Sequence, residues 1–500
     1  MSTSTSGTHQ EEAAQLEALG YKSTYSRSMS LWGNIALGFT YLSPLVAIYA
    51  LFAVAVSTGG PPSIWWIVIV GGGQLLVALV FGEIVSQFPI AGGLYPWARR
   101  LWGKRYAWIF SWIYVWAMIV TITSVIEFST GYATEIFGVE YNPLTQLLFA
   151  VGILVLALVL NLFGTRTMSI IARIGLAAEL VGVVGVGLYL LIFQRHNDWS
   201  VFFDTFGKGD GGNYIGTAFV AAALVGLFMF YGFEACGDVA EEVKDAARRV
   251  PRAMYLTIFV GGVSALFSFA GYVMAAPNLA GIVNGDDMNP IPGILESSLG
   301  PVGAKIFLAV AVLAFISCTL SLQAAASRLI QSKARDGMLP ASKWLAKLTP
   351  RTQVPRNALL VASIIPIILT IVIYVLPDSL VPITQFAVLG IYVSFQSVVL
   401  ASLVQRFRGW KPAGPFHLGV WGLIINILAL VYGIWAIIWM LQPGATGNWV
   451  VDWATWLGLG VVLVAGVLYM LIARPAGKSN APAGDAIAVA NMMRAKAAAK

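Results

Sequence analysis

Long apolar segments alternate with short polar ones along nearly the whole chain. A window of about 19 residues finds roughly twelve stretches that could each cross a hydrocarbon core of about 30 Å as a helix. The pattern therefore predicts an all-α integral membrane protein with twelve transmembrane helices. The predicted spans are 32–57, 64–87, 106–136, 144–162, 170–193, 214–240, 254–276, 302–332, 357–376, 380–404, 418–441 and 453–473.

The composition agrees with this pattern. Of the 500 residues, 58% are hydrophobic and 11% are charged, and the mean hydropathy is +0.79. A water-soluble fold could not bury that much apolar surface. We expect a twelve-helix domain over 31–475 between two poorly ordered tails, 1–30 and 476–500. The first tail lacks the features of a cleaved signal peptide, so the first span is expected to be retained as a signal anchor.

Basic residues follow every even-numbered span, whereas the opposite loops are mainly acidic. Because basic loops stay in the cytoplasm, this asymmetry predicts cytoplasmic termini and a multi-pass protein of the cell (inner) membrane. It also accounts for the net charge of +7 without a nucleic-acid partner. The basic groups follow span 2 (Arg99, Arg100, Lys104, Arg105), span 4 (Arg166, Arg173), span 6 (Lys244, Arg248, Arg249, Arg252), span 8 (Arg328, Lys333, Arg335, Lys343, Lys347, Arg351, Arg356) and span 10 (Arg406, Arg408, Lys411).

Two spans contain residues that interrupt a helix. In span 1, Pro44 removes a backbone donor and disfavours helical backbone at Ser43. In span 6, the interruption is Tyr231-Gly232-Phe233. Non-helical backbone inside a bilayer must be buried in protein or line a cavity. Either break alone is compatible with a structural kink, but together they begin two successive five-helix sets, as in an inverted-repeat transporter.

Three carboxylates lie deep in the predicted spans. Glu234 follows the second break, Glu179 lies in span 5 and Glu127 in span 3. A charge at that depth costs several kcal/mol unless it faces protein or water. Because no Lys or Arg is comparably central, these groups are expected to be protonated or to face a cation, which fits proton-coupled movement of an amine. For Glu234 the candidate partners are a proton, the N–H groups of the first break, or the ammonium of a cargo.

The other reactive side chains are assigned structural roles. Cys236 and Cys318 lie inside spans and are expected to be buried core residues rather than a disulfide. Glu83 is expected to cap a helix or pair with Arg99 or Arg100. No cofactor or metal site is expected, because the spans show no nucleotide fingerprint and no His and carboxylate set with metal-ligand spacing. The same absences argue against an ATP-driven pump and against an enzyme.

Three motifs resemble those of a known family. The segment GFEACGDVAEEVKDAARRVPRAM at 232–254 resembles the sixth-helix signature of amino acid permeases of the amino acid, polyamine and organocation superfamily. FGEIVSQFP at 81–89, followed by AGGLY at 91–95, resembles their second-helix signature, and ARDGMLP at 334–340 resembles the link after helix 8. The first break looks more like that of the amino acid/choline transporter branch. The resemblance covers the whole twelve-span region.

The resemblance implies a LeuT-like five-plus-five inverted repeat with broken helices 1 and 6, two further helices, and alternating access. In such permeases the helix 1 break binds the substrate carboxylate, and the helix 6 break supplies carbonyls and an aromatic lid. Glu179 is similar in position to a helix 5 Lys that replaces sodium in some proton-coupled members. The implied coupling residues are Glu179 and Glu234, and the candidate substrate-binding residues, with Glu127 added for its depth, are Gly38, Thr40, Tyr41, Leu42, Ser43, Phe230, Tyr231, Gly232, Phe233 and Glu127.

These observations predict a secondary active transporter that imports an amino acid or related amino compound, such as an ω-amino acid, with a proton or sodium as coupling ion. A choline, polyamine or other organic amine is the alternative cargo, and a non-transporting nutrient sensor is a remote alternative. Glu179 could carry the proton, hold sodium or meet a cationic substrate. The expected partners are this cargo, the coupling ion and the lipid bilayer, and nothing in the sequence specifies an oligomeric state.

Overall fold

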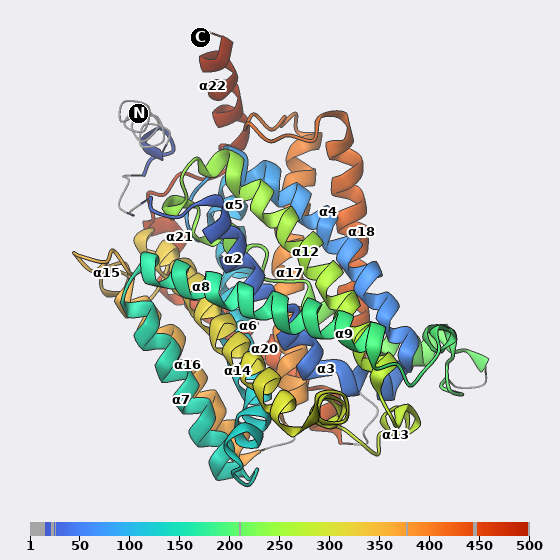
Figure 1. The fold of residues 1–500 in the computed structure, drawn as a ribbon. Coiled ribbons are helices and arrows are strands. Elements are labelled where there is room, and N and C mark those ends of the chain that lie inside the picture. The colour runs from blue at the N-terminus through green and yellow to red at the C-terminus, as the bar shows by residue number, and fades with distance from the viewer. Residues whose placement is uncertain are drawn as a thin grey trace, which may run out of the picture.

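The computed structural model describes residues 16–21, 25, 27–209, 212–376, 379–443 and 448–498. Over these residues the chain is helical (Figure 1), and its only β-type pairing there is an isolated bridge between Met29 and Val243. Eleven helical segments of the described chain are long and apolar enough to cross a membrane. This confirms the all-α membrane class. The twelve-span count and the inverted repeat stay predictions, because the sixth predicted span is divided.

The helices before the sixth predicted span follow the predicted order. Gly103 precedes α6 and Gly164 precedes α8, each with a positive φ. Ser30 and Asn142 cap the starts of α2 and α7 with their side chains. The elements are α2 (Leu31–Leu42), α3 (Pro44–Gly59), η1 (Pro61–Ile64), α4 (Trp65–Gln87), α5 (Leu94–Leu101), α6 (Lys104–Phe137), α7 (Pro143–Leu162), α8 (Thr165–Glu179), the π-helical η2 (Leu180–Gly185), α9 (Val186–Phe193) and η3 (Trp199–Phe203).

The helices after the sixth predicted span also match the pattern. The longest of them, α14, bends at Gly300, whose φ of 72° interrupts the helix just before the predicted start of span 8. The elements are α12 (Ala246–Ala275), α13 (Leu279–Asn284), α14 (Pro290–Arg335), α15 (Ser342–Leu345), α16 (Arg356–Val375), α17 (Leu380–Phe407), η8 (Gly419–Trp421), α18 (Gly422–Met440), α19 (Trp449–Asp452), α20 (Ala454–Ala473), α21 (Pro475–Lys478) and α22 (Ala486–Ala498).

Both predicted helix breaks are present. The first span is split at Ser43, whose φ of 40° ends α2 and begins α3. This break is narrower than Gly38 to Ser43, because Gly38 to Leu42 stay helical within α2. The sixth span is divided into the π-helical η5 (Ile215–Phe219), α10 (Leu224–Met229), α11 (Ala235–Asp238) and η6 (Ala240–Glu242).

The broken first span lies inside the bundle. Figure 1 shows α2 and α3 between α8 and α14 on one side and α12 on the other, and α2 contacts all three of these helices. Exposed apolar side chains are instead concentrated on α16, α18 and α20. Lipid is as apolar as these side chains, so such outer faces need no protein partner. The helices with breaks are therefore the ones shielded from lipid.

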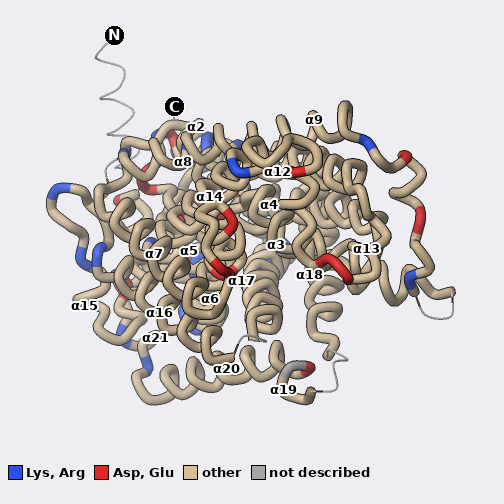
Figure 2. The backbone as a smooth tube through the Cα atoms, turned by 60° about the horizontal axis from the view of Figure 1, so that its bottom comes forward, with Lys and Arg blue, Asp and Glu red and all other residues tan. Residues whose placement is uncertain are grey.

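Charged residues lie mainly near the ends of the helices, where several basic residues pair with buried carboxylates. In Figure 2 acidic segments lie near α13, α14 and α19, and basic segments gather beside α15. The first described residues and α22 lie together at one end of the bundle in Figure 1. An even number of crossings would give this arrangement, and the predicted loop asymmetry would make that end cytoplasmic.

The prediction of a poorly ordered C-terminal tail is wrong for the described residues. Gly484 donates its backbone N–H to the carbonyl of Arg99 at 2.9 Å, and Gln87 donates its side-chain amide to the carbonyl of Ala486 at 2.9 Å. The buried side chain of Val489 then holds α22 against the bundle. Partners nearly 400 residues away supply this order, so the local pattern of the tail does not show it. The described part of the N-terminal tail is also ordered, because Tyr21 donates its hydroxyl to Asp336 at 3.0 Å. Residues 1–15, 22–24 and 26 of this tail lie outside the described residues.

The expected partner of Glu83 is also wrong. Its carboxylate forms an ion pair with Arg406 and accepts the backbone N–H of Leu418 at 2.6 Å. The two arginines expected to pair with it have other carboxylates closer to them in the fold. Arg99 pairs with Asp336, and Arg100 with Asp485.

Candidate functional site

The two helix breaks touch each other. Gly232, with φ of 115°, lies so near the first break that a Cβ there would be 2.5 Å from the backbone nitrogen of Leu42 and 2.8 Å from a ring carbon of Tyr41. Side chains almost never tolerate contacts that short, and L residues rarely adopt this φ. Glycine at this position is therefore what allows the two breaks to meet.

Glu234 has two protein partners. Its Oε2 accepts the backbone N–H of Gly232 at 2.7 Å, and its Oε1 accepts the hydroxyl of Tyr114, on α6, at 2.9 Å. Its side chain is fully buried. The N–H group therefore comes from the same break and not from the first one, which corrects the expectation. Tyr114 was missed because it precedes Glu234 by 120 residues and carries no local signal.

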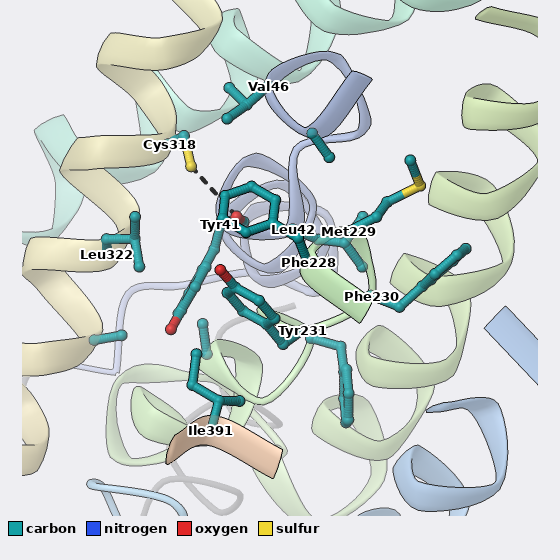
Figure 3. Close-up of a cluster of buried hydrophobic side chains, with 14 of the residues drawn as sticks. Tyr41, Leu42, Val46, Phe228, Met229, Phe230, Tyr231, Cys318, Leu322 and Ile391 are labelled. Carbon is teal, nitrogen blue, oxygen red and sulfur yellow. Dashed lines mark hydrogen bonds between the residues drawn. The ribbon is translucent and has the colours of Figure 1, made fainter. Parts of the chain in front are cut away.

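Aromatic side chains surround the meeting point. The rings of Tyr41 and Tyr231 lie 6.4 Å apart and nearly perpendicular, and Phe228 packs against Tyr231 at 5.6 Å. Figure 3 shows this cluster, in which the thiol of Cys318 donates to the carbonyl of Tyr41. The hydroxyls of Tyr41 and Tyr231 are buried beside the Glu234 carboxyl and Thr121, respectively, without a hydrogen bond of good geometry to any described residue. Such unsatisfied groups, facing a carboxylate and aromatic rings, can bind a polar cation.

Glu179 lies at the start of α3. Its fully buried carboxyl lies beside the hydroxyl of Ser43 and the backbone N–H of Leu45, without a hydrogen bond of good geometry to any described residue. Ser43 Oγ accepts the backbone N–H of Val46 at 3.3 Å, and Pro44 has no N–H. Groups of the protein itself therefore already lie at the free donors of this half-helix, with Ser43 bonded to Val46 and Glu179 beside Leu45.

Two other predicted residues join α2 to its neighbours. The hydroxyl of Thr40 lies 2.7 Å from that of Ser321 on α14. A Cβ at Gly38 would lie 2.5 Å from the sulfur of Cys236, so glycine permits close packing of α2 against α11. Both Cys236 and Cys318 are buried free thiols. Thr40 and Gly38 thus position the first break without being part of it.

Three predicted residues point elsewhere. Phe230 packs on Gly71 and Gly262, away from Tyr41 (Figure 3). The glycines permit this contact, since a Cβ at either of them would lie within 3.3 Å of the Phe230 ring. Phe233 packs against Phe81 and Phe395. Glu127 accepts a hydrogen bond from Gln146 on α7 at 2.9 Å. It lies 13 residues beyond Tyr114, the partner of Glu234, on α6, which at 1.5 Å per residue is about 20 Å along that helix.

Asp238 adds a second buried carboxylate near Glu234. Both of its oxygens are buried without a hydrogen-bond partner among the described residues. A Cβ at Gly93 would lie 2.4 Å from one of them, and Gly92 donates its N–H to the backbone carbonyl of Asp238 at 2.9 Å. The glycine pair before α5 therefore makes room for this carboxyl.

The three sequence motifs converge at the basic end of the bundle. Glu241, from the 232–254 motif, accepts the backbone N–H of Ala91 at 3.0 Å and pairs with Arg335 at 3.0 Å. Its neighbour Glu242 pairs with Arg328 at 2.8 Å. Ala91 and Arg335 belong to the other two motifs, so the three motifs meet in one contact. Within the described chain, no group of His, Cys, Asp or Glu is arranged to hold a metal ion.

This chain is similar to proteins named as amino-acid permeases and to one named as a choline transporter. The family model described as "Amino acid permease" matches residues 29–473. The amino-acid permease BAT1 of Arabidopsis thaliana is 25% identical over 448 residues, which cover 84% of this chain and 86% of that protein. Its homolog in Oryza sativa is also 25% identical, with coverages of 84% and 85%. A choline transporter of Saccharomyces cerevisiae is 24% identical, with coverages of 83% and 76%.

Proposed function

This chain belongs to the amino acid permease family, and from that premise we propose that it imports an amino acid or related amino compound across the cell membrane together with a proton. Members of such a family are membrane transporters rather than enzymes. The observation that carries the proposal is the meeting of the two breaks at Gly232 and Leu42, with the buried Glu234 beside them. Irregular backbone and a carboxylate in the middle of a membrane bundle are typical of a transport site.

The cargo amine would bind between the first and sixth spans. The carboxylate of Glu234, the hydroxyls of Tyr41 and Tyr231, and the aromatic faces of both tyrosines can replace the water lost by an ammonium group. Alternating access would then require the ion pairs of Glu241 and Glu242 to open on the basic side of the bundle. The expected direction is toward the cytoplasm, and both termini are expected on that side.

Glu179 is our candidate for the proton. It lies beside Ser43 and Leu45 at the start of α3, so a change of its charge would act directly on the backbone of the first break. Burial without a charged partner among the described residues favours the neutral form of this carboxyl. A change of its charge therefore requires the uptake or release of a proton. Sodium at this position is the competing assignment.

Uptake into sealed proteoliposomes tests this assignment. We expect an inward proton gradient to drive accumulation of a labelled amino compound, and Glu179→Gln to abolish the gradient-driven part while the protein stays folded by size-exclusion chromatography. Glu296→Gln, at an exposed carboxylate, is the matched control and should transport normally. Full uptake on a sodium gradient alone, at equal pH on both sides, would show that the proton assignment is wrong.

A second cargo class is favoured by a specific observation. The donors at the start of α3 face Ser43 and Glu179, so a carboxylate of the cargo would compete with a carboxyl already there. An organic amine without a carboxylate, such as choline, avoids that competition. Ligand binding raises stability by mass action, so a thermal-shift comparison of an amino acid with the amino alcohol that has a hydroxymethyl group in place of its carboxylate separates the two. A larger shift with the amino acid supports the first cargo class, and a larger shift with the alcohol supports the second.

A further inference from the structure

A cavity outside the proposed transport site opens between the end of α17 and the start of α18. Its volume is about 460 Å³, and its walls include Arg406, Trp410, Lys411, His417 and Val420. It lies in the basic link after span 10, at one edge of the bundle. The transport mechanism proposed above makes no use of it.

The cavity carries excess positive charge. Residues 379–451 contain no Asp or Glu, and Glu83 is the one carboxylate in its wall. That carboxylate is already bonded to Arg406 and to the backbone of Leu418. Lys411 and the adjacent Arg408 are exposed and form no ion pair with the described residues. Their charges therefore remain available to an external anion.

Arg406 is held so that part of its guanidinium is free. Its Nε donates to Asn426 at 3.1 Å, one terminal nitrogen is taken by Glu83, and the guanidinium lies over the ring of Trp410 at 5.5 Å. The other terminal nitrogen lies against Gly422, where a Cβ would be 2.8 Å from it. η8 runs directly into α18, so the positive end of this helix lies at Gly419, in the wall of the cavity.

The rim of the cavity is apolar. Of the lining residues, Phe407 is 71% exposed and Val420 is 88% exposed. In a membrane protein such exposed side chains at the end of a span contact acyl chains and the interface. A small soluble anion would use the basic wall but gain nothing from this rim. A molecule with a phosphate and fatty chains would use both.

We propose that this cavity binds the headgroup of an anionic phospholipid, with its phosphate on Arg406 and Lys411 and its acyl chains along Phe407 and Val420. Basic pockets between transmembrane helices are recognised sites for such headgroups. The proposal is independent of the cargo and of the coupling ion. It predicts a lipid that stays with the protein during purification.

Native mass spectrometry of the full chain in detergent tests the proposal. Phosphatidylglycerol is compared with phosphatidylcholine of the same acyl chains, and we expect the anionic lipid to be retained more strongly. Lys411→Ala should weaken its binding about fivefold, since one basic group near a membrane surface contributes on the order of 1 kcal/mol. Arg351→Ala, at an exposed basic residue of another link, is the matched control and should change nothing.

Three results would overturn the proposal: equal retention of the two lipids, unchanged binding in Lys411→Ala, or full displacement of phosphatidylglycerol by the same concentration of inorganic phosphate. The last would assign the cavity to a free anion. If Lys411→Ala does not fold, the salt dependence of the unaltered protein decides. Retention of the anionic lipid should fall as sodium chloride rises from about 0.05 to about 0.5 M, because the Debye length shortens, and a retention independent of salt contradicts the assignment.

Discussion

Gly232→Ala is the sharpest perturbation of the proposed transport site. The new methyl carbon would stand 2.5 Å from the backbone nitrogen and 2.8 Å from the Cα of Leu42. These are backbone atoms that cannot rotate away, so the two breaks must separate by roughly 1 Å to reach an ordinary contact of about 3.5 Å or more. The substitution also places an L residue at a φ of 115°.

The expected cost follows from these two effects. Backbone in a sparsely populated φ region costs about 1–3 kcal/mol, and overpacking costs a further 1–3 kcal/mol, roughly. Gly72→Ala on α4 is the matched control, because a Cβ there meets nothing within 4 Å. In a helix this control should be neutral or slightly stabilising, by about 0.5–1 kcal/mol.

Two measurements check this prediction. Thermal unfolding in detergent should show a lower Tm for Gly232→Ala than for either the unaltered protein or Gly72→Ala. Uptake into proteoliposomes should be lost in Gly232→Ala even below its Tm, because the breaks no longer meet. If Gly232→Ala transports normally and unfolds at the unaltered temperature, the breaks do not need this contact and the reasoning is refuted.

Two further predictions concern the contacts that hold the bundle around the site. Thr40→Ala should lower the free energy of unfolding by about 1 kcal/mol, because it removes the hydrogen bond to Ser321. A double-mutant cycle with Ser321→Ala should measure an interaction energy between the two residues, and additive effects of the two substitutions would contradict the prediction. Arg406→Ala should destabilise the protein by about 3–5 kcal/mol, because Glu83 stays buried without its ion partner. Adding Glu83→Gln should restore much of the lost Tm. A double variant no more stable than Arg406→Ala would show that the loss of stability has another cause.

Local chemistry was enough to locate the breaks. Pro44 lacks a backbone donor and Gly232 lacks a Cβ. Each therefore favours non-helical backbone in its own segment, whatever packs nearby. Eleven of the twelve predicted spans match helical segments long and apolar enough to cross a membrane, because crossing a bilayer requires a continuous apolar run, whereas the sixth is divided. Only the extent of the first break was overestimated, since Gly38 to Leu42 keep their helical hydrogen bonds up to Ser43.

The partners of charged groups were not predicted correctly. Glu83 was expected to pair with Arg99 or Arg100, which are near in sequence, but it pairs with Arg406, which is 323 residues away. Of the three candidate partners of Glu234, the N–H groups of the first break are wrong, because Gly232 and Tyr114 donate to it instead; the proton and the cargo amine stay predictions. Many residues could pair with any one carboxylate, and helix packing selects among them.

The sequence by itself determined the membrane class, the order of the helices, the two breaks and the carboxylates buried among apolar residues. These features depend on transfer of side chains and backbone from water to lipid, which each segment experiences largely alone. The tertiary structure decided that Gly232 meets Leu42, that Glu179 faces α3, that the side chain of Phe230 packs on Gly71 and Gly262, and that Gln146 holds Glu127. Such contacts depend on which helices lie side by side, and no single segment contains that information.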